Sequence, residues 1–212
     1  AEGGVGGKTY NFKAMGEDIF YTKDKENNFI NFSGCGNTLN CNHKVVKDMI
    51  IQSLLYWYLE VGVDGFRFDL APVLGRDSNS QWARHSLLYE LVEHPILSHA
   101  KLIAESWDLG GYFVGAMPSG WCEWNGAYRD TVRQFIRGDF GQVPELIKRI
   151  FGSVDIFHAN KNGYQSSINF ICCHDGFTMW DLVSYNLKHN LLNGENNQDG
   201  ENNNHSYNHG EE

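Results

Sequence analysis

Three short apolar runs, each of which contains or ends in an acidic residue, constrain this sequence more than any other feature. Runs of this length, rich in β-branched and aromatic residues, predict buried strands. They are Val63–Leu70, Lys101–Glu105 and Ser167–Asp175, with the acids Asp69, Glu105 and Asp175. Asp69 and Glu105 are 36 positions apart and Glu105 and Asp175 are 70 apart, close to twice that spacing. The spacing predicts a repeating unit, with one further strand between the second acid and the third.

Helical periodicity fills the intervals between these runs. Apolar residues spaced by three and four predict helices that begin near His43 and cover roughly Gln81–Leu91, Tyr128–Arg137 and Val143–Phe151. Buried strands that alternate with helices predict an α/β fold with a parallel sheet. A unit of about 30 to 35 residues is what a (β/α)8 TIM barrel of about 250 residues needs, with the acids at the carboxyl ends of its strands. We therefore expect part of a TIM barrel, and a doubly wound open sheet is the alternative.

The sequence predicts one partial catalytic barrel domain over residues 1–212. Residues 1–42 form a loop-rich lead-in, residues 43–192 contain the strand–helix units, and residues 193–212 form a polar loop. The chain does not begin with Met and stops within this polar loop, so we expect it to be part of a longer protein. The first residues resemble no signal peptide.

Charge and cysteine usage narrow the partners and the compartment. A net charge of −9 argues against a nucleic-acid partner, since few phosphates could be neutralised. No run of apolar residues is long enough to span a membrane. The five cysteines are odd in number and irregularly spaced, which does not fit a disulfide framework. We expect an intracellular, reducing compartment, either the bacterial cytoplasm or the plastid stroma.

The three acids suit glycoside hydrolysis, which needs one ionised and one protonated carboxyl group. Arg67 lies two residues before Asp69, on the same face of a strand, and is expected to keep Asp69 ionised as a nucleophile. Glu105 follows an apolar run, which favours a raised pKa and the role of acid. Asp175 follows His174, and this pair is placed to contact sugar hydroxyl groups.

Each of these residues also has an ordinary structural interpretation. An acid after a strand often caps the next helix, and an isolated arginine often makes a surface ion pair. Three acids at the same end of three barrel strands favour a functional site. Cys172 and Cys173 are expected to be buried strand residues without a redox or metal role.

Longer motifs resemble a known family. The segments are Val63–Ala71, Leu102–Asp108, Cys173–Thr178, Glu123–Asp130, Asn193–Gly200 and Gly34–Asn40. The first three resemble the second, third and fourth conserved regions of the α-amylase superfamily, glycoside hydrolase family 13. Together the six are similar to isoamylase-type debranching enzymes, in the expected order and over nearly the whole chain.

The resemblance implies a retaining hydrolase that cleaves α-1,6 branch points of glycogen, amylopectin or limit dextrin. Asp69 would be the nucleophile, Glu105 the general acid and base, and Asp175 the stabiliser of the transition state. Arg67 and His174 would contact the attacked glucose. The superfamily's first conserved region is absent, so the chain would span roughly barrel strands four to seven. We predict that these 212 residues alone are poorly stable and nearly inactive.

Aromatic residues near the strand ends are candidates for sugar stacking, and we select Trp107 and Trp124 as substrate-binding residues. Tyr112, Trp121 and Trp180 lie in similar places, and packing is the alternative for every one of them. The chemistry needs no cofactor. The loop over residues 193–204 has alternating oxygen ligands that faintly resemble a calcium site, but their order does not match an EF-hand, so a solvated loop is the prediction.

Two other functions are alternatives for this sequence. A non-catalytic glucan-binding subunit built on this barrel would normally have lost one of the three acids. Another α-glucan enzyme of the superfamily, such as an α-1,4 hydrolase or a branching enzyme, would differ in the long motifs between the acids. The oligomeric state and the preferred branch length are not indicated by the sequence.

Overall fold

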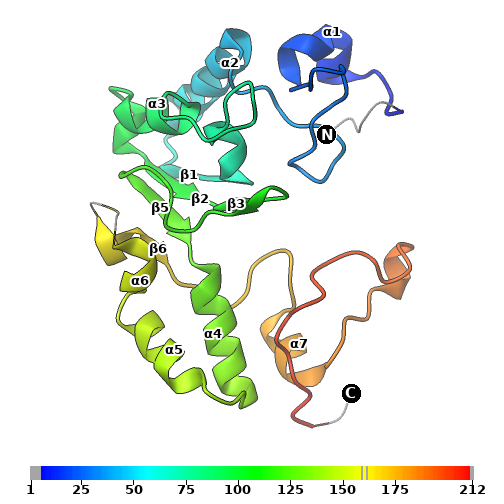
Figure 1. Ribbon diagram of the computed structural model, residues 1–212, viewed down its shortest axis with the longest axis vertical. Coiled ribbons are helices and arrows are strands. Elements are labelled where there is room, and N and C mark those ends of the chain that lie inside the picture. The colour runs from blue at the N-terminus through cyan, green and yellow to red at the C-terminus, as the bar shows by residue number, and fades with distance from the viewer. Residues whose placement is uncertain (1–5, 159, 161, 211–212) are drawn as a thin grey trace. The chain divides into compact units, whose positions relative to one another are not determined.

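The computed structural model describes residues 6–158, 160 and 162–210 (Figure 1). The chain divides into two compact units, Ala1–Glu123 with Ala159–Asn162, and Trp124–His158 with Gly163–Glu212. Each unit has its own secondary structure and its own part of the predicted site, so each is described by itself.

A small parallel sheet forms the centre of the first unit. Strand β1 (Gly65–Phe68) pairs in parallel with β2 (Lys101–Ala104), and β2 pairs in parallel with β5 (Trp121–Trp124). Gly65 lies opposite Lys101, and a Cβ atom at Gly65 would approach the Lys101 carbonyl oxygen to 2.4 Å. Glycine is therefore required where the two strands begin to pair. The pairing confirms the predicted α/β fold with parallel strands.

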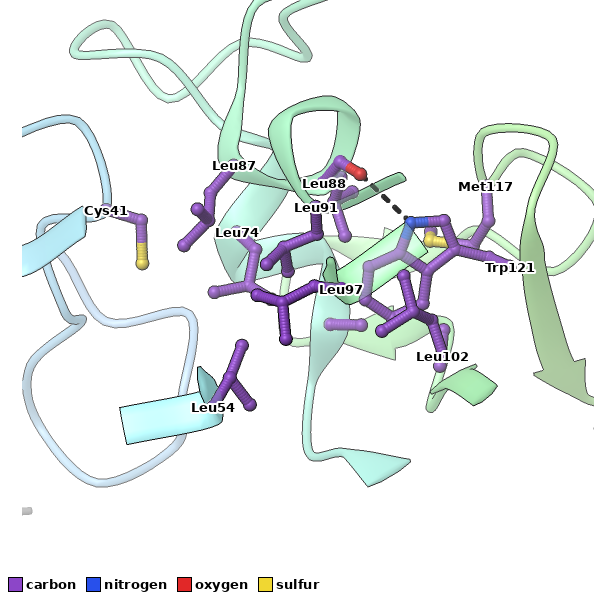
Figure 2. Close-up of a cluster of buried hydrophobic side chains, with 12 residues drawn as sticks. Cys41, Leu54, Leu74, Leu87, Leu88, Leu91, Leu97, Leu102, Met117 and Trp121 are labelled. Carbon is purple, nitrogen blue, oxygen red and sulfur yellow. Dashed lines mark hydrogen bonds between the residues drawn. The ribbon is translucent and has the colours of Figure 1, made fainter. Parts of the chain in front are cut away.

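The hydrophobic core of the first unit packs between this sheet and its helices (Figure 2). Trp121 on β5 is completely buried, and its indole N–H donates to the carbonyl oxygen of Leu88 at 3.0 Å. Leu87, Leu88 and Leu91 come from α3 (Leu87–Glu93) and are also completely buried. Burial of one such side chain stabilises the fold by about 1.5 to 3 kcal/mol. Trp121 is thus a core residue, and its suggested role in sugar stacking is wrong.

The helices of the first unit match the prediction in part. Helix α2 (Lys44–Leu55) begins where expected, because the His43 side chain accepts a hydrogen bond from Val45 N–H, and it continues as a π-helix over Tyr56–Val61. The helix predicted over Gln81–Leu91 begins only at Leu87, as α3.

The predicted loop-rich lead-in over residues 1–42 contains a helix, α1 (Asn11–Phe20). Its apolar residues Phe12 and Phe20 stack at 4.7 Å. A kink at Gly16 (φ 148°) interrupts the helical period, and this explains why the pattern was missed.

The second unit is mostly helical. Its helices are α4 (Gly126–Arg137), α5 (Gln142–Ile150), α6 (Val154–Phe157) and α7 (Met179–Ser184). Asn125 caps α4 by accepting from Tyr128 N–H at 2.9 Å, and Gly138 ends the helix in the left-handed conformation (φ 89°). Thr178 and Asp181 form a capping box at the start of α7. The two predicted helices, over Tyr128–Arg137 and Val143–Phe151, are confirmed to within two residues.

The third predicted strand, Ser167–Asp175, is much shorter than expected. Only β6 (Ser167–Ile168) is a strand, and it is held where Asn125 N–H donates to the Ile168 carbonyl oxygen at 2.9 Å. The carbonyl oxygen of Ile171 is instead bound by the Arg133 guanidinium. A side chain therefore takes the place of a partner strand. Cys172 and Cys173 lie in this irregular segment and are half-buried, so their assignment as buried strand residues is wrong.

All five cysteines are free thiols, and none is placed in a disulfide. Burial raises the pKa of the Cys41 thiol to about 12, which keeps it protonated and unreactive at neutral pH. Within the described ranges, the chain has no helix that is both long and apolar enough to cross a membrane.

Candidate active site

Arg67 connects two of the predicted acids at the carboxyl ends of β1 and β2. Its Nη1 donates to Asp69 Oδ1 at 2.6 Å, and its Nη2 donates to Glu105 Oε2. Arg67 and Asp69 are two residues apart and therefore share a face at the end of β1. The parallel register places Phe68 beside Ala104, so the residues that follow them, Asp69 and Glu105, emerge side by side.

Glu105 is the more buried of these two acids. It is only 4% exposed, whereas the Asp69 side chain is 68% exposed. Burial raises the pKa of Glu105, and hydrogen bonding with Asp69 raises it further, while Leu70 N–H and the charge of Arg67 oppose the rise. A buried carboxyl group with a raised pKa beside an exposed carboxyl group is the pairing that general acid catalysis needs.

The backbone after Asp69 turns sharply to reach Glu105. Leu70 adopts the left-handed conformation (φ 43°, ψ 50°), which is strained for a residue with a branched side chain. In this conformation its N–H donates to Glu105 Oε2 at 3.3 Å, and Ala71 N–H donates to the Glu105 carbonyl oxygen at 2.9 Å. The strain is thus associated with contacts that fix Glu105.

Glu123 is a further buried acid of the first unit, and it is not among the acids predicted at the strand ends. It lies on β5 opposite Ala104, is fully buried, and accepts hydrogen bonds from Gly115 N–H at 2.8 Å and from Met117 N–H. Burial raises its pKa to about 7. Trp121 and Glu123 share the inward face of β5. The sequence feature that indicates this buried acid is a glutamate within a run of aromatic residues.

A short hairpin follows Glu105 and presents aromatic residues. Strands β3 (Trp107–Asp108) and β4 (Gly111–Tyr112) pair antiparallel, and the rings of Trp107 and Tyr112 stack at 5.9 Å. The base of the hairpin is fixed by Arg76, which donates to both carboxylate oxygens of Asp108, while its guanidinium stacks on Phe32 at 3.8 Å. A bidentate pair of this kind is geometrically specific. It holds Trp107 on a rigid support.

Asp175 lies in the second unit, at the edge of an open hollow of about 900 Å³. Asp175 and His174 are both exposed, in the irregular segment between β6 and α7. The ring of Trp124 lies 6.2 Å from His174 and 5.4 Å from Phe170. The lining is polar, with residues suited to hydroxyl groups: His174, Asp175, Asp181, Tyr185, Lys188, His189, Asn190, Asp199, Glu201, Asn202 and Asn204.

Contacts from distant residues hold the segment around Asp175. Glu201 N–H donates to the Asp175 carbonyl oxygen at 3.1 Å, and Phe177 N–H donates to Asn204 Oδ1 at 2.9 Å. The buried Arg133 of α4 binds the carbonyl oxygens of both Ile171 and Asn204. Most residues of the loop over 193–204 are exposed, as predicted, and the loop is also hydrogen-bonded to the backbone on both sides of the Asp175 side chain.

One group of residues in the described ranges offers metal-ligand atoms close together. The ligand atoms of Cys173, His174 and Asp175 lie within 4.8 Å of one another. His174 and Asp175 are exposed, and the Cys173 thiol donates to Asp175 Oδ1. Burial raises the pKa of the Cys173 thiol and Asp175 adds to the rise, so the thiolate that a metal would need is disfavoured.

The structure thus gathers the predicted residues in two groups. Arg67, Asp69 and Glu105 meet in the first unit, next to the hairpin of Trp107. His174 and Asp175 lie with Trp124 in the second unit.

No family model matches the chain. It is 45% identical to the isoamylase SU1, chloroplastic, of Zea mays, over all of the chain and 30% of that protein. It is 48% identical to a glycogen operon protein GlgX homolog of Mycobacterium bovis, again over all of the chain and 30% of the relative. The chain is thus similar to isoamylases and to GlgX proteins. It spans less than a third of the length of these curated relatives.

The chain also resembles solved structures. A pullulanase from Anoxybacillus sp. LM18-11, crystallised with maltotriose, matches with a TM-score of 0.58 and 27% sequence identity. The match covers 76% of this chain and 24% of the pullulanase. The shared fold is an α/β arrangement around a parallel sheet.

Proposed function

We propose that the protein containing this chain is a retaining glycoside hydrolase that cleaves α-1,6 branch points of glycogen, amylopectin or limit dextrin. The observation that supports this most directly is the pair of acids, Asp69 and Glu105, joined by Arg67 and differing in burial. The names of the relatives, isoamylase and glycogen operon protein, supply the substrate class.

The close contact between Asp69 and Glu105 favours retention of configuration. One guanidinium reaches both carboxyl groups, and Asp69 lies within hydrogen-bonding reach of Glu105. Retaining glycosidases hold their two carboxyl groups about 5 Å apart, whereas inverting ones leave a gap of about 6.5 to 9.5 Å for a water molecule. Two carboxyl groups bridged by a single guanidinium fit the shorter separation, so we expect a retaining mechanism.

The first step divides the work between the two acids. Glu105 gives its proton to the oxygen of the α-1,6 bond, and the exposed Asp69 carboxylate attacks the anomeric carbon. The bond from that carbon to the leaving oxygen breaks, and a glycosyl ester on Asp69 forms. The buried setting of Glu105 raises its pKa, which favours the protonated form that this step needs.

The second step restores both residues. Glu105, now ionised, removes a proton from water, and the resulting hydroxide attacks the anomeric carbon. The ester bond breaks and returns Asp69 as a carboxylate. Arg67 stabilises whichever of the two carboxyl groups is charged, because it contacts both.

The remaining predicted residues complete the proposed site. Asp175 stabilises the positive charge that develops at the anomeric carbon, and His174 binds hydroxyl groups of the same sugar. Trp107 and Trp124 present ring faces to glucose units. In this proposal the strands belong to a (β/α)8 barrel, roughly its strands four to seven, with the acids at the carboxyl ends of its strands.

The surroundings of the site fit a reducing compartment and a neutral ligand. Five free thiols and a charge of −9 suit a branched α-glucan and not a polyanion. We propose that no metal or other cofactor takes part in the reaction.

We also propose that the chain is one partial domain, with a lead-in over residues 1–42, strand–helix units over 43–192 and a polar loop over 193–212.

The test uses the full-length protein and its Glu105→Gln variant on amylopectin, with chain-length analysis of the products. The parent should release whole side chains, and the variant should be slower by about 10²- to 10⁴-fold. An aryl α-glucoside whose leaving group needs no proton should restore much of the first step.

Release of products from a glucan with only α-1,4 links, and none from limit dextrin, would contradict the proposed bond specificity. A parent that binds branched glucan but hydrolyses nothing would indicate a non-catalytic glucan-binding subunit.

A further inference from the structure

Lys188 is a buried cation whose ammonium group is bound by the backbone alone. It is 8% exposed, and its Nζ donates to the carbonyl oxygens of Gln198, Asp199 and Gly200 at 3.1, 3.0 and 3.0 Å. Three consecutive carbonyl oxygens point at one atom. A lysine ammonium has three donors and no acceptor, so these contacts satisfy it fully.

The chain adopts an unusual conformation to make this ring of carbonyl groups. Asn196, Asn197 and Gly200 all have positive φ angles, of 50°, 62° and 77°. Side chains support the turn, since Asn190 Nδ2 donates to the Asp199 carbonyl oxygen at 3.0 Å and Asn190 N–H donates to Asn197 Oδ1 at 2.8 Å. Such a conformation persists only where contacts of this kind hold it.

The ring connects directly to Asp175. The next residue after Gly200 is Glu201, whose N–H donates to the Asp175 carbonyl oxygen at 3.1 Å. Three residues further on, Asn204 binds Phe177 N–H. The backbone at 198–200 is therefore linked to the backbone on both sides of Asp175 through one or two hydrogen bonds.

We propose that Lys188 is a positioning residue for Asp175: its ammonium group acts as a built-in cation that folds the 193–204 loop and so fixes the acid. This rests on the role of Asp175 in the proposed function. A loop rich in carbonyl and carboxylate oxygens would otherwise need a bound cation to converge in this way. Lys188 supplies that charge covalently, so the loop needs no metal ion.

The experiment compares Lys188→Met with the parent in the full-length protein. Methionine keeps the length and apolar stem of the side chain but removes the charge and all three donors. We expect kcat to fall about 100-fold, as for a catalytic group displaced by about 1 Å, with KM changed less than three-fold. Chelator treatment of the parent should leave kcat unchanged. The matched control is Lys148→Met, since Lys148 is an exposed lysine of α5 paired only with Glu145 at 2.6 Å, and kcat should stay within two-fold.

Chemical rescue distinguishes positioning from general loss of folding. Lys188→Ala removes the atoms of n-propylammonium, so added n-propylammonium should restore kcat at least ten-fold and in a saturable way, whereas Asp175→Asn should not respond. Gly200→Ala perturbs the ring from the loop side, where a Cβ atom would meet Asn190 Nδ2 at 3.1 Å, and should lower kcat without altering the lysine.

Hydrogen exchange separates this inference from the proposed function. Peptides covering residues 171–177 and 196–204 should exchange faster in Lys188→Met than in the parent, and this result does not depend on activity. An active parent with unchanged kcat and unchanged exchange at 171–177 in the variant would overturn the role of Lys188. A parent without activity on any α-glucan would overturn the proposed function, and coupled exchange of the two peptides would still support the connection between the loop and Asp175.

Discussion

The two units hold their acids by opposite means. In the first unit, Asp69 and Glu105 follow paired parallel strands and are joined by the side chain of Arg67. In the second unit, Asp175 follows an irregular segment, and hydrogen bonds to its own backbone and that of its neighbours hold it. Strand register and an ion pair position the acids of the first unit. A folded loop positions Asp175 in the second unit.

This difference separates electrostatic tuning from geometric positioning. Arg67 changes the charge balance of the acids it touches, and burial raises the pKa of Glu105. Lys188 and Arg133 reach Asp175 only through backbone groups. Changes at Arg67 should therefore alter both rate and pH dependence, whereas changes at Lys188 should alter rate alone.

The largest expected effect comes from removing the acids themselves. Asp69→Asn should lower kcat by about 10⁴-fold or more, because the amide cannot form the glycosyl ester. Asp175→Asn should lower kcat by about 10²- to 10³-fold, the loss typical of one group that stabilises transition-state charge. Rapid-quench analysis with an activated substrate should trap a covalent intermediate in the parent and in Asp175→Asn.

These assignments would be reversed if the Asp69→Asn variant still formed the covalent intermediate. They would also be reversed if the glycosyl group were found on Asp175 in the parent. Asp77→Asn is a suitable control, since Asp77 lies in the same unit as Asp69 but only accepts backbone N–H groups of a turn, and it should leave kcat unchanged.

Arg67→Met tests the electrostatic half of the comparison. The charge of Arg67 opposes the burial that raises the pKa of Glu105, so its removal should raise that pKa further. Glu105 acts as an acid and must be protonated, so the alkaline limb of the kcat/KM profile should move to higher pH. The rate at the optimum should also fall, by about 100-fold, since two acids lose a shared partner.

Lys188→Met provides the contrast in the second unit. It should lower kcat by a similar amount while leaving the alkaline limb where it is in the parent. A limb that shifts equally in both variants would show that the two units do not differ in the way described.

The same contrast explains what the sequence could and could not predict. Period-2 alternation placed Arg67 beside Asp69, and the apolar run before Glu105 indicated its burial, because strand geometry is local. The extent of β6 was overestimated, because the contact that replaces a partner strand comes from Arg133, 38 residues away from Ile171. The burial of Lys188 could not be predicted from the sequence, because a lysine in a polar segment has the pattern of a solvated side chain.

Burial of Glu123 should make the folding stability of the first unit depend on pH. Burial raises the pKa of Glu123 from 4.5 to about 7, so between these values the unfolded chain loses the proton and the folded chain keeps it. Folding stability should therefore fall as pH rises through this window, by about 3 kcal/mol in total. Glu123→Gln keeps the acceptor for Gly115 N–H and should remove this loss. Its thermal midpoint should equal that of the parent at pH 4.5 and exceed it by a few degrees at pH 7.5.

A constant difference between the midpoints across that pH range would show that Glu123 is not the titrating group. Glu90→Gln is the matched control. Glu90 is a partly exposed acid of α3 paired with Lys47, and its replacement should not change the pH dependence in this way.

The smallest expected effect concerns the two aromatic residues, one in each unit. Trp107 stacks only on Tyr112 of a hairpin held by the Arg76–Asp108 pair, so Trp107→Ala should leave the acids in place and raise KM about five-fold, the equivalent of about 1 kcal/mol of lost stacking. Trp124 contacts His174 and Phe170, which flank the segment before Asp175, so Trp124→Ala should lower kcat as well as raise KM. Steady-state kinetics on one linear and one branched oligosaccharide would separate these effects. If both variants changed KM alone, Trp124 would serve as a sugar platform without any part in holding Asp175, and the loop would hold that acid unaided.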